Sequence, residues 1–255
     1  MNAVSTTLES VRLVVSSRTE YATRLARNVE EVRAAQSLRY QVFNLELKGG
    51  LEQSHATGCD ADPFDDVCDH LLVEHMPSKQ IVGTYRLQTG HNAAAHLGYY
   101  CAQEFEFQVL EPLRAEMIEL GRACVHSQHR NLLVLGLLWK GIADYARRYG
   151  ARYLFGCSSL TSQDPAVGAS AYVELCRKHL APHAWRSRPL PAYACSLEHL
   201  AAEPPKIPKL LRAYLTLGAK ICGPPALDRQ FKTIDFLTLL DLDTLSPLTR
   251  ERFLA

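Results

Sequence analysis

The stretch Met117-Ile-Glu-Leu-Gly-Arg-Ala-Cys-Val125 has the apolar character of a buried strand, and two further elements follow it closely. Residues 132–149 show the apolar spacing of a helix that ends at Gly150, and Tyr153-Leu-Phe-Gly-Cys-Ser158 indicates another strand. A strand, a polar turn, a helix and a second strand predict a crossover that places the two strands in parallel. This region therefore predicts an α/β domain with at least one parallel strand pair.

The residues before this unit predict strands and one helix. Alternation over 21–26 indicates a strand, and apolar residues at helical spacing over 29–47 indicate a helix. The helix ends at Gly49-Gly50, and the polar stretch as far as Asp66 predicts a loop of a length that is more often functional than idle. Residues 69–75 and 81–87 are predicted to form a hairpin.

The residues after this unit extend the same architecture. Helices are expected over 165–180 and 209–219, and a strand over 233–240. We predict a single α/β domain over 19–255, with a mixed central sheet flanked by helices. Its C-terminal extension, residues 198–255, is expected to return a strand to the sheet. Residues 1–18 are rich in Ser and Thr and are predicted to be a flexible tail.

Charge and hydropathy exclude several classes of protein. The 255 residues carry 28 Lys+Arg against 27 Asp+Glu, and a net charge of +1 gives no overall attraction to nucleic acid. No apolar run approaches the ~20 residues of a membrane-spanning helix. The N-terminal residues have neither the basic nor the apolar region of a secretory signal. We therefore expect a cytoplasmic protein that binds no nucleic acid.

The eight cysteines include no Cys-x-x-Cys pair and no short cluster with histidine at metal-ligand spacing, so we expect no bound metal. Cys124 and Cys157 lie in apolar strands, where a free cysteine commonly serves as a small hydrophobic residue. A catalytic thiolate would need a partner such as histidine. The nearest candidates, His126 and His129, lie in a polar turn that is typical of solvated side chains.

Glu119-Leu-Gly-Arg122 places an acid and a guanidinium three residues apart inside the apolar strand. Positions three apart face opposite sides of a regular strand. A bulge at Gly121 would shift the alternation and bring both side chains to one face. It would also separate the strand from its neighbour and leave backbone N–H groups free to bind a carbonyl oxygen and the oxyanion it becomes. The alternative is two unrelated charges, each paired with nearby loops.

Other charged positions are candidates for substrate binding. Arg39 and Phe43 share one helix face, which suits a carboxylate with an apolar neighbour or an acyl thioester, although an ordinary surface salt bridge of Arg39 fits equally well. Asp66 and Asp69 are placed to accept hydrogen bonds from a substrate ammonium, with a cap or turn role as the alternative for Asp66. Arg86 is a lone charge in a core strand, so we expect it to have a carboxylate partner.

The turn Gln128-His-Arg-Asn-Leu-Leu133 precedes the central helix, where free N–H groups and the helix dipole can bind phosphate. His129 and Arg130 add positive charge to this turn. The absence of glycine argues against a close phosphate cradle.

Five motifs follow one another along the chain: Leu38-Arg-Tyr-Gln-Val-Phe43, Asp66-x-x-Asp-His-Leu-Leu-Val73, Val82-Gly-Thr-Tyr-Arg-Leu87, Glu119-Leu-Gly-Arg122 and Cys222-Gly-Pro-Pro-Ala-Leu-Asp-Arg-Gln-Phe231 with Ile234-Asp-Phe236. In this order they resemble the bacterial ornithine lipid N-acyltransferases, which belong to the GCN5-related N-acyltransferase superfamily. The likeness extends from about residue 21 to residue 242. Ordered motifs are stronger evidence than any one alone.

The chain is also similar, more distantly, to the acyl-homoserine-lactone synthases. These share the pattern of Arg39 with Phe43 and of Glu119 with Arg122, but they usually carry a tryptophan shortly after the phenylalanine. The only tryptophans here are Trp139 and Trp185. This difference disfavours lactone synthesis.

The resemblance implies the superfamily fold and an acyl donor presented on acyl carrier protein. In the superfamily, glycines in the turn after the central strand hold the pyrophosphate of coenzyme A, and here Asn131 and Leu133 stand at those positions. The phosphopantetheine arm of the carrier lacks that pyrophosphate, so no separate cofactor is expected. The carrier is acidic, and local basic residues are expected to dock it. These are Arg130, Arg147, Arg148, Arg152, Lys206, Lys209 and Arg212.

The implied reaction transfers a (3-hydroxy)acyl chain from the carrier to the α-amine of ornithine and yields lyso-ornithine lipid. The attacking amine must lose a proton, which makes Glu119 the expected base and Arg122 a second catalytic residue. The oxyanion and the pantetheine arm are assigned to Gly121, Ala123, Val125 and Arg130. Substrate binding is assigned to Arg39, Phe43, Asp66, Asp69 and Arg86.

Two alternatives stay open at this point. The runner-up is a related N-acyl amino acid synthase that uses glycine or an aromatic amino acid. The other is a non-catalytic module that binds the acyl carrier or acyl chain, against which the intact pairs Glu119/Arg122 and Asp66/Asp69 argue. The sequence determines neither acyl chain length, nor hydroxylation, nor oligomeric state. An amphiphilic product makes peripheral contact with the inner membrane a reasonable expectation.

Overall fold

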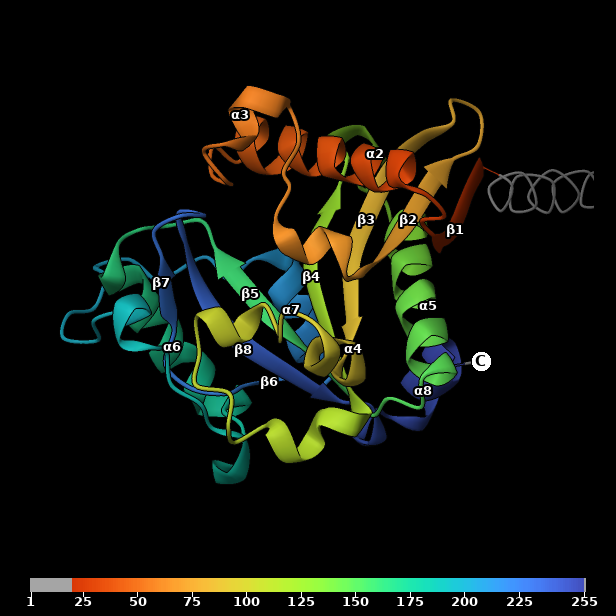
Figure 1. Ribbon diagram of the computed structural model, residues 1–255. Coiled ribbons are helices and arrows are strands. Elements are labelled where there is room, and N and C mark those ends of the chain that lie inside the picture. The colour runs from red at the N-terminus through yellow and green to blue at the C-terminus, as the bar shows by residue number, and fades with distance from the viewer. Residues whose placement is uncertain (1–19, 255) are drawn as a thin grey trace, which may run out of the picture.

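A computed structural model describes residues 20–254, and its centre is an open, mixed eight-stranded sheet (Figure 1). The strand order is β1-β2-β3-β4-β5-β8-β6, with β7 also paired to β8. The strands are β1 Tyr21–Leu25, β2 Asp69–His75, β3 Gln80–Thr89, β4 Met117–Val125, β5 Tyr153–Leu160, β6 Lys220–Ile221, β7 Ala226–Asp228 and β8 Thr233–Asp241. The predicted tail, residues 1–18, lies outside the described residues, and the domain boundaries stay predictions.

Helices flank this sheet as predicted. The α-helices are α2 Val29–Tyr40, α3 Ser54–Thr57, α4 Gly90–Ala95, α5 Leu132–Arg148, α6 Pro165–His179, α7 Lys209–Thr216 and α8 Pro247–Leu254. Within the described residues, no helix is both long and apolar enough to cross a membrane.

Helix α5 begins at Asn131, whose side chain accepts a hydrogen bond from the backbone N–H of Val134 and so caps the first turn. Its apolar stripe packs in one cluster with Tyr85 and Leu87 of β3. Because successive side chains of a strand point to opposite faces, Arg86 faces the other side of the sheet. There it meets the loop that follows α2. The two helices therefore cover opposite faces of the N-terminal half of the sheet.

Strands β4 and β5 are parallel, which confirms the predicted crossover. They pair only from Met117 to Glu119 on β4, whereas β5 pairs with β8 over its whole length. Beyond Glu119 the two strands separate, and the sheet opens in its middle. The predicted separation of this strand from its neighbour is confirmed.

The pairing of β3 with β4 is also irregular. Thr84 lies opposite Cys124 and Arg86 lies opposite Gly121, so that Tyr85 alone faces two residues of β4. One of these, Arg122, has a φ of 51°. This is the β-bulge that the sequence predicted at Gly121, centred one residue later.

The structure differs from the prediction in several segments, which include the unpredicted helices α4 and α8. The predicted helix over 29–47 ends as an α-helix at Tyr40 and continues as a π-helical turn, η1 Gln41–Glu46, because the Leu47 N–H bonds to the Val42 carbonyl. The predicted loop after it contains α3 and a short 3-10 helix, η2 Pro63–Asp66. Strands β6 and β7 were not predicted, because two or three residues are too few for a pattern and both exist through their pairing with β8.

Candidate active site

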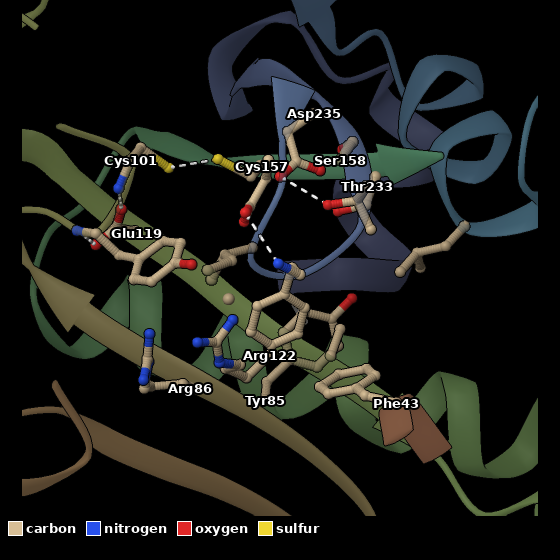
Figure 2. A pocket seen from close by; sticks show the side chains of 18 of the residues that line it. Phe43, Tyr85, Arg86, Cys101, Glu119, Arg122, Cys157, Ser158, Thr233 and Asp235 are labelled. Atoms are coloured by element: carbon tan, nitrogen blue, oxygen red, sulfur yellow. Dashed lines mark hydrogen bonds between the residues drawn. The ribbon is translucent and has the colours of Figure 1, made fainter. Parts of the chain in front are cut away.

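A cavity of about 370 Å³ lies where β4 and β5 separate (Figure 2). This volume is within the range of small-ligand sites. One wall is formed by β3 and β4, and the facing wall by β5 and the segment that leads into β8. The charged, polar or aromatic lining residues, cysteines apart, are Phe43, Tyr85, Arg86, Gln88, Tyr100, Glu119, Arg122, Ser158, Ser159, Thr161, Tyr214, Asp228, Phe231, Thr233 and Asp235.

Glu119 is the acid at the point where the strands separate, and it is only 5% exposed. Its Oε1 accepts a hydrogen bond from the Cys101 N–H at 2.7 Å, and its Oε2 accepts one from the Tyr100 N–H at 2.9 Å. Gln88 Nε2 also donates to Oε2, at 3.3 Å. Burial raises the pKa of the Glu119 carboxyl, although these bonds oppose the shift. Oε1 retains acceptor capacity toward the cavity.

Three arginines and three aspartates form a buried charge network beside the cavity. Arg39 Nε and Arg122 Nε lie 3.0 and 3.4 Å from Asp60 Oδ1. Arg86 Nη1 lies 2.6 Å from Asp62 Oδ1 and 3.0 Å from Asp65 Oδ1. The remaining pairs are Arg39 with Asp65 at 2.5 Å and Arg122 with Asp62 at 2.6 Å.

The charges of this network are balanced, with three positive and three negative groups. Burial alone would raise the pKa of Asp65, but Arg39 and Arg86 hold it well below its ordinary value. Burial likewise opposes the effect of Arg86 and Arg122 on Asp62, whose pKa is also lowered. Asp62 and Asp65 are therefore held ionised, and the ion pairs of the network tie the loop after α2 to β3 and β4.

The turn that supplies the aspartates is itself held by local bonds. The Asp62 side chain accepts from the Phe64 N–H, and Asp65 accepts from the Asp62 N–H, which together make a capping box on η2. Pro63 occupies the first helical position. The local sequence thus presents carboxylates toward the sheet.

Aromatic rings cover the arginines on the cavity side. The guanidinium carbon of Arg122 lies 4.1 Å from the ring centre of Phe231 and 4.8 Å from that of Tyr100. Phe43, on the π-helical turn, contacts Phe231 edge to face, with ring centres 5.9 Å apart. These contacts fix the guanidinium by cation–π attraction.

The facing wall carries acids and small polar residues (Figure 2). Asp235 of β8 and Asp228 of β7 line the cavity and are buried. Cys157 of β5 lies between the walls, with its Sγ 3.4 Å from Cys101 Sγ. Burial raises the pKa of the Cys101 thiol, and the contact with Cys101, together with burial, raises that of Cys157, so neither is a ready nucleophile.

The structure brings six predicted site residues to the cavity: Phe43, Arg86, Glu119, Gly121, Arg122 and Ala123. The bulge places Glu119 and Arg122 together, as expected. Arg86 has the predicted carboxylate partners.

The other predicted site residues lie elsewhere. Arg39 is fully buried behind the cavity, so neither a surface salt bridge nor direct substrate contact describes it. Asp66 is exposed outside the cavity, and Asp69 accepts a hydrogen bond from the Tyr145 hydroxyl at 2.7 Å. Val125 pairs with Gly83. Arg130 forms an exposed ion pair with Glu46 at 2.5 Å, away from the cavity lining.

Sequence reasoning missed the aspartates that meet the arginines and the acids of the facing wall. Asp60, Asp62 and Asp65 lie in the loop whose length indicated function, but three neighbouring carboxylates looked alike until their partners were known. Asp228 and Asp235 fall within the last of the five motifs. The available signal for a buried acid was Asp235, which stands between Ile234 and Phe236 in an apolar strand, whereas Asp228 is followed by the polar Arg229 and Gln230.

The arrangement joins a buried acid–base group to an open strand edge. From Leu120 onward β4 has no strand partner on the side of β5, and nothing lies within 4 Å of the place where a Gly121 side chain would begin. Free backbone N–H groups at such an edge can hold a carbonyl oxygen. The site is therefore suited to proton removal from a nucleophile that attacks an acyl group.

Comparison with solved structures shows the same fold. The acyl-homoserine-lactone synthase LasI is 13% identical, with a TM-score of 0.51 over 92% of this chain and 95% of LasI. FeeM, an N-acyl amino acid synthase from uncultured soil microbes, is 11% identical, with a TM-score of 0.55 over 91% and 96%. A family model described as acetyltransferase (GNAT) domain matches residues 38–140. Fold and site define a GNAT-type N-acyltransferase.

Curated relatives show to which family of N-acyltransferases the chain belongs. The L-ornithine N(alpha)-acyltransferase of Rhodobacter capsulatus is 35% identical over 245 residues, which cover 91% of this chain and 93% of the relative. The enzyme of the same name from Brucella abortus is 35% identical over 241 residues, covering 88% and 85%. The chain belongs to the L-ornithine N(alpha)-acyltransferase family, which confirms the resemblance seen in the motif order.

Proposed function

We propose that this chain transfers a (3-hydroxy)acyl group from acyl carrier protein to the α-amine of ornithine and so forms lyso-ornithine lipid. The observation that carries the proposal is the opening between β4 and β5 with Glu119 at its closed end. The names of the relatives support ornithine as the acceptor.

The thioester carbonyl would lie against the free edge of β4 near Gly121 and Ala123. The neutral α-amine attacks this carbon, and Glu119 takes the proton that the nitrogen loses, directly or through water. Backbone N–H groups and the nearby guanidinium of Arg122 stabilise the oxyanion. The intermediate collapses when the carbon–sulfur bond breaks, and the pantetheine thiolate leaves and takes up a proton. The product carries an amide bond.

An apolar space beside the cavity suits the start of the acyl chain. A second cavity of about 30 Å³ shares four lining residues with the first, and its further apolar lining includes Trp139, Leu154 and Leu240. The shared residues are Leu120, Cys157, Ser158 and Tyr214. It lies behind the opening in the sheet. Small movements of these side chains would admit methylene groups at a gain of about 0.8 kcal/mol each.

A carrier protein as donor is supported by the surface at the cavity entrance. Pro208 and Leu210 line the cavity, and the neighbouring Lys206, Lys209 and Arg212 are exposed. None of these three forms an ion pair within the described residues. They are therefore free to meet an acidic carrier, whereas Arg130 and Arg152 already pair with acids.

The test is thiol release from a 3-hydroxyacyl carrier protein by the purified chain with ornithine, glycine or tyrosine as acceptor. We expect release that depends on ornithine, with mass spectrometry placing the acyl group on the α-nitrogen. Faster release with glycine or tyrosine would favour the other N-acyl amino acid synthases. Binding of the carrier without any release would favour the non-catalytic module.

A further inference from the structure

The facing wall of the cavity holds an acidic cluster that the transfer mechanism does not use. Glu104 and Asp235 are 2% and 3% exposed, and Asp228 is 4% exposed. Ligand atoms of Glu104, Asp235 and Cys157 all lie within 4.8 Å of one another. Asp228, Asp235 and Cys157 line the cavity, and Glu104 lies beside Asp235 and Cys157. We call these three carboxyl groups the acidic wall.

The acidic wall lacks a counter-ion in the described part of the chain. Thr233 donates to Asp235 Oδ2, and the N–H groups of Gln230 and Phe231 donate to Asp228 Oδ1. Asp235 Oδ1 and both oxygens of Glu104 have no hydrogen-bond donor within the described residues. The Asp235 carboxyl lies next to Glu104, and the Ser159 hydroxyl lies close enough to Asp235 to oppose the rise of its pKa. No lysine, arginine or histidine pairs with any of the three within residues 20–254.

This contrasts with the network on the opposite wall, where three arginines neutralise three aspartates. Burial raises the pKa of Asp235 to about 6 and that of Glu104 well above its ordinary value. Burying a carboxylate without a partner costs free energy, and a cation bound beside it would offset that cost. Arg122 attracts Glu104 without forming an ion pair with it, so this wall has room for a cation in direct contact with its carboxyl groups.

Resting on the proposed function, we propose that the acidic wall binds the side-chain ammonium of a diamino acid acceptor while Glu119 meets its α-amine. A primary ammonium has three donors, which suit Asp235 Oδ1, a Glu104 oxygen and Asp228. The two positions are linked through the chain: Glu119 accepts from the Cys101 N–H, and Cys101 Sγ contacts Cys157 Sγ beside Asp235. The acceptor is thereby oriented with the correct amine toward the thioester.

The test compares ornithine with norvaline, which has the same carbon chain but no second amine, in the wild type and in Asp235→Asn and Glu104→Gln. We expect the wild type to prefer ornithine in kcat/KM. Each variant should lower this preference by roughly 10- to 100-fold, because a charge-assisted hydrogen bond is lost. Transfer to norvaline should persist. Glu174→Gln, an exposed acid on α6, is the matched control and should leave the preference unchanged.

The outcomes separate this inference from the proposed function. A wild type that does not acylate ornithine would refute the proposed function. A wild type that acylates ornithine and norvaline equally would refute the acidic wall alone, and this measurement needs no folded variant. So would a preference that survives in both variants. Stoichiometric zinc in the purified protein would also overturn the inference, because a metal would then occupy Glu104, Asp235 and Cys157.

Discussion

At the scale of single residues, Glu119 owes its chemistry to its surroundings. Its carboxyl is buried, yet three donors orient it, one on Oε1 and two on Oε2. Burial dominates and raises its pKa above that of a solvated glutamate. A raised pKa brings a carboxylate closer to the basicity that proton removal at neutral pH requires.

Replacing Glu119 by glutamine should lower kcat by roughly 10²- to 10⁴-fold, the usual contribution of a general base. A base acts only when deprotonated, so wild-type kcat/KM should fall as pH decreases through the raised pKa of Glu119. This fall should occur at higher pH than for an ordinary glutamate and should be absent from the residual activity of the variant. Steady-state kinetics across pH will measure both effects.

Glu116→Gln is the control for this variant, because Glu116 is exposed just before β4 begins. It should behave as the wild type does. Full activity of Glu119→Gln with the same pH profile would show that another group removes the proton.

Arg39 was predicted to bind substrate, but its surroundings in the structure give it a structural role. Its position four residues before Phe43 suggested a shared binding face. In the structure it is fully buried and paired with Asp60 and Asp65, while Phe43 lies on the π-helical turn and faces the cavity. Arg39 therefore positions the loop after α2 and does not itself face the substrate.

At the scale of secondary-structure elements, the opening between β4 and β5 depends on a close approach just before it. A Cβ atom on Gly156 would lie 2.2 Å from the Leu120 carbonyl oxygen. Only glycine lets β5 lie so near to β4 at this point. The two strands then diverge around the cavity.

Gly156→Ala should therefore push β5 away from β4. We expect it to destabilise the fold by about 1–3 kcal/mol, as overpacking does, and to reduce acyl transfer because the cavity changes shape. Thermal unfolding and the thiol-release assay will measure the two effects.

Gly136→Ala is the contrasting change in α5, since no atom lies within 4 Å of the Cβ it would add. Alanine in a helix interior should stabilise the protein by about 0.5–1 kcal/mol and leave activity unchanged. If Gly156→Ala were as stable and as active as the wild type, the close strand approach would not shape the site.

At the scale of the whole molecule, the near-zero net charge conceals an uneven distribution. The arginines beside the cavity are neutralised internally, and the acidic wall has no counter-ion in the described chain. The basic residues beside the cavity entrance, by contrast, are exposed and unpaired there. The proposed docking of an acidic carrier therefore requires a local basic patch rather than the overall charge.

Reversing two charges of that patch, with Lys209→Glu and Arg212→Glu together, should raise the KM for the acyl carrier protein about 10-fold. The kcat at saturation should be unchanged, because the reacting groups lie deeper in the cavity. Added salt should shrink the difference between wild type and variant, since screening weakens attraction between exposed charges. Initial rates at several ionic strengths will measure this.

Arg177→Glu with Lys178→Glu makes the same change of charge on exposed residues of α6 and serves as the control. Its KM for the carrier should match that of the wild type. An equal rise in both double variants would mean that overall charge, rather than this patch, governs docking.

The sequence by itself determined the order of the main elements, the parallel crossover, the bulge in β4 and the family. Each of these can be predicted from local periodicity, from a single glycine or from ordered motifs. It also brought Glu119 and Arg122 together. Only the tertiary structure decided which charges pair and which face the cavity. Arg39 meets Asp60 and Asp65, and Glu104 meets Asp235, through contacts between segments far apart in the chain. Local patterns do not encode such contacts, because burial and pairing are properties of the packed fold.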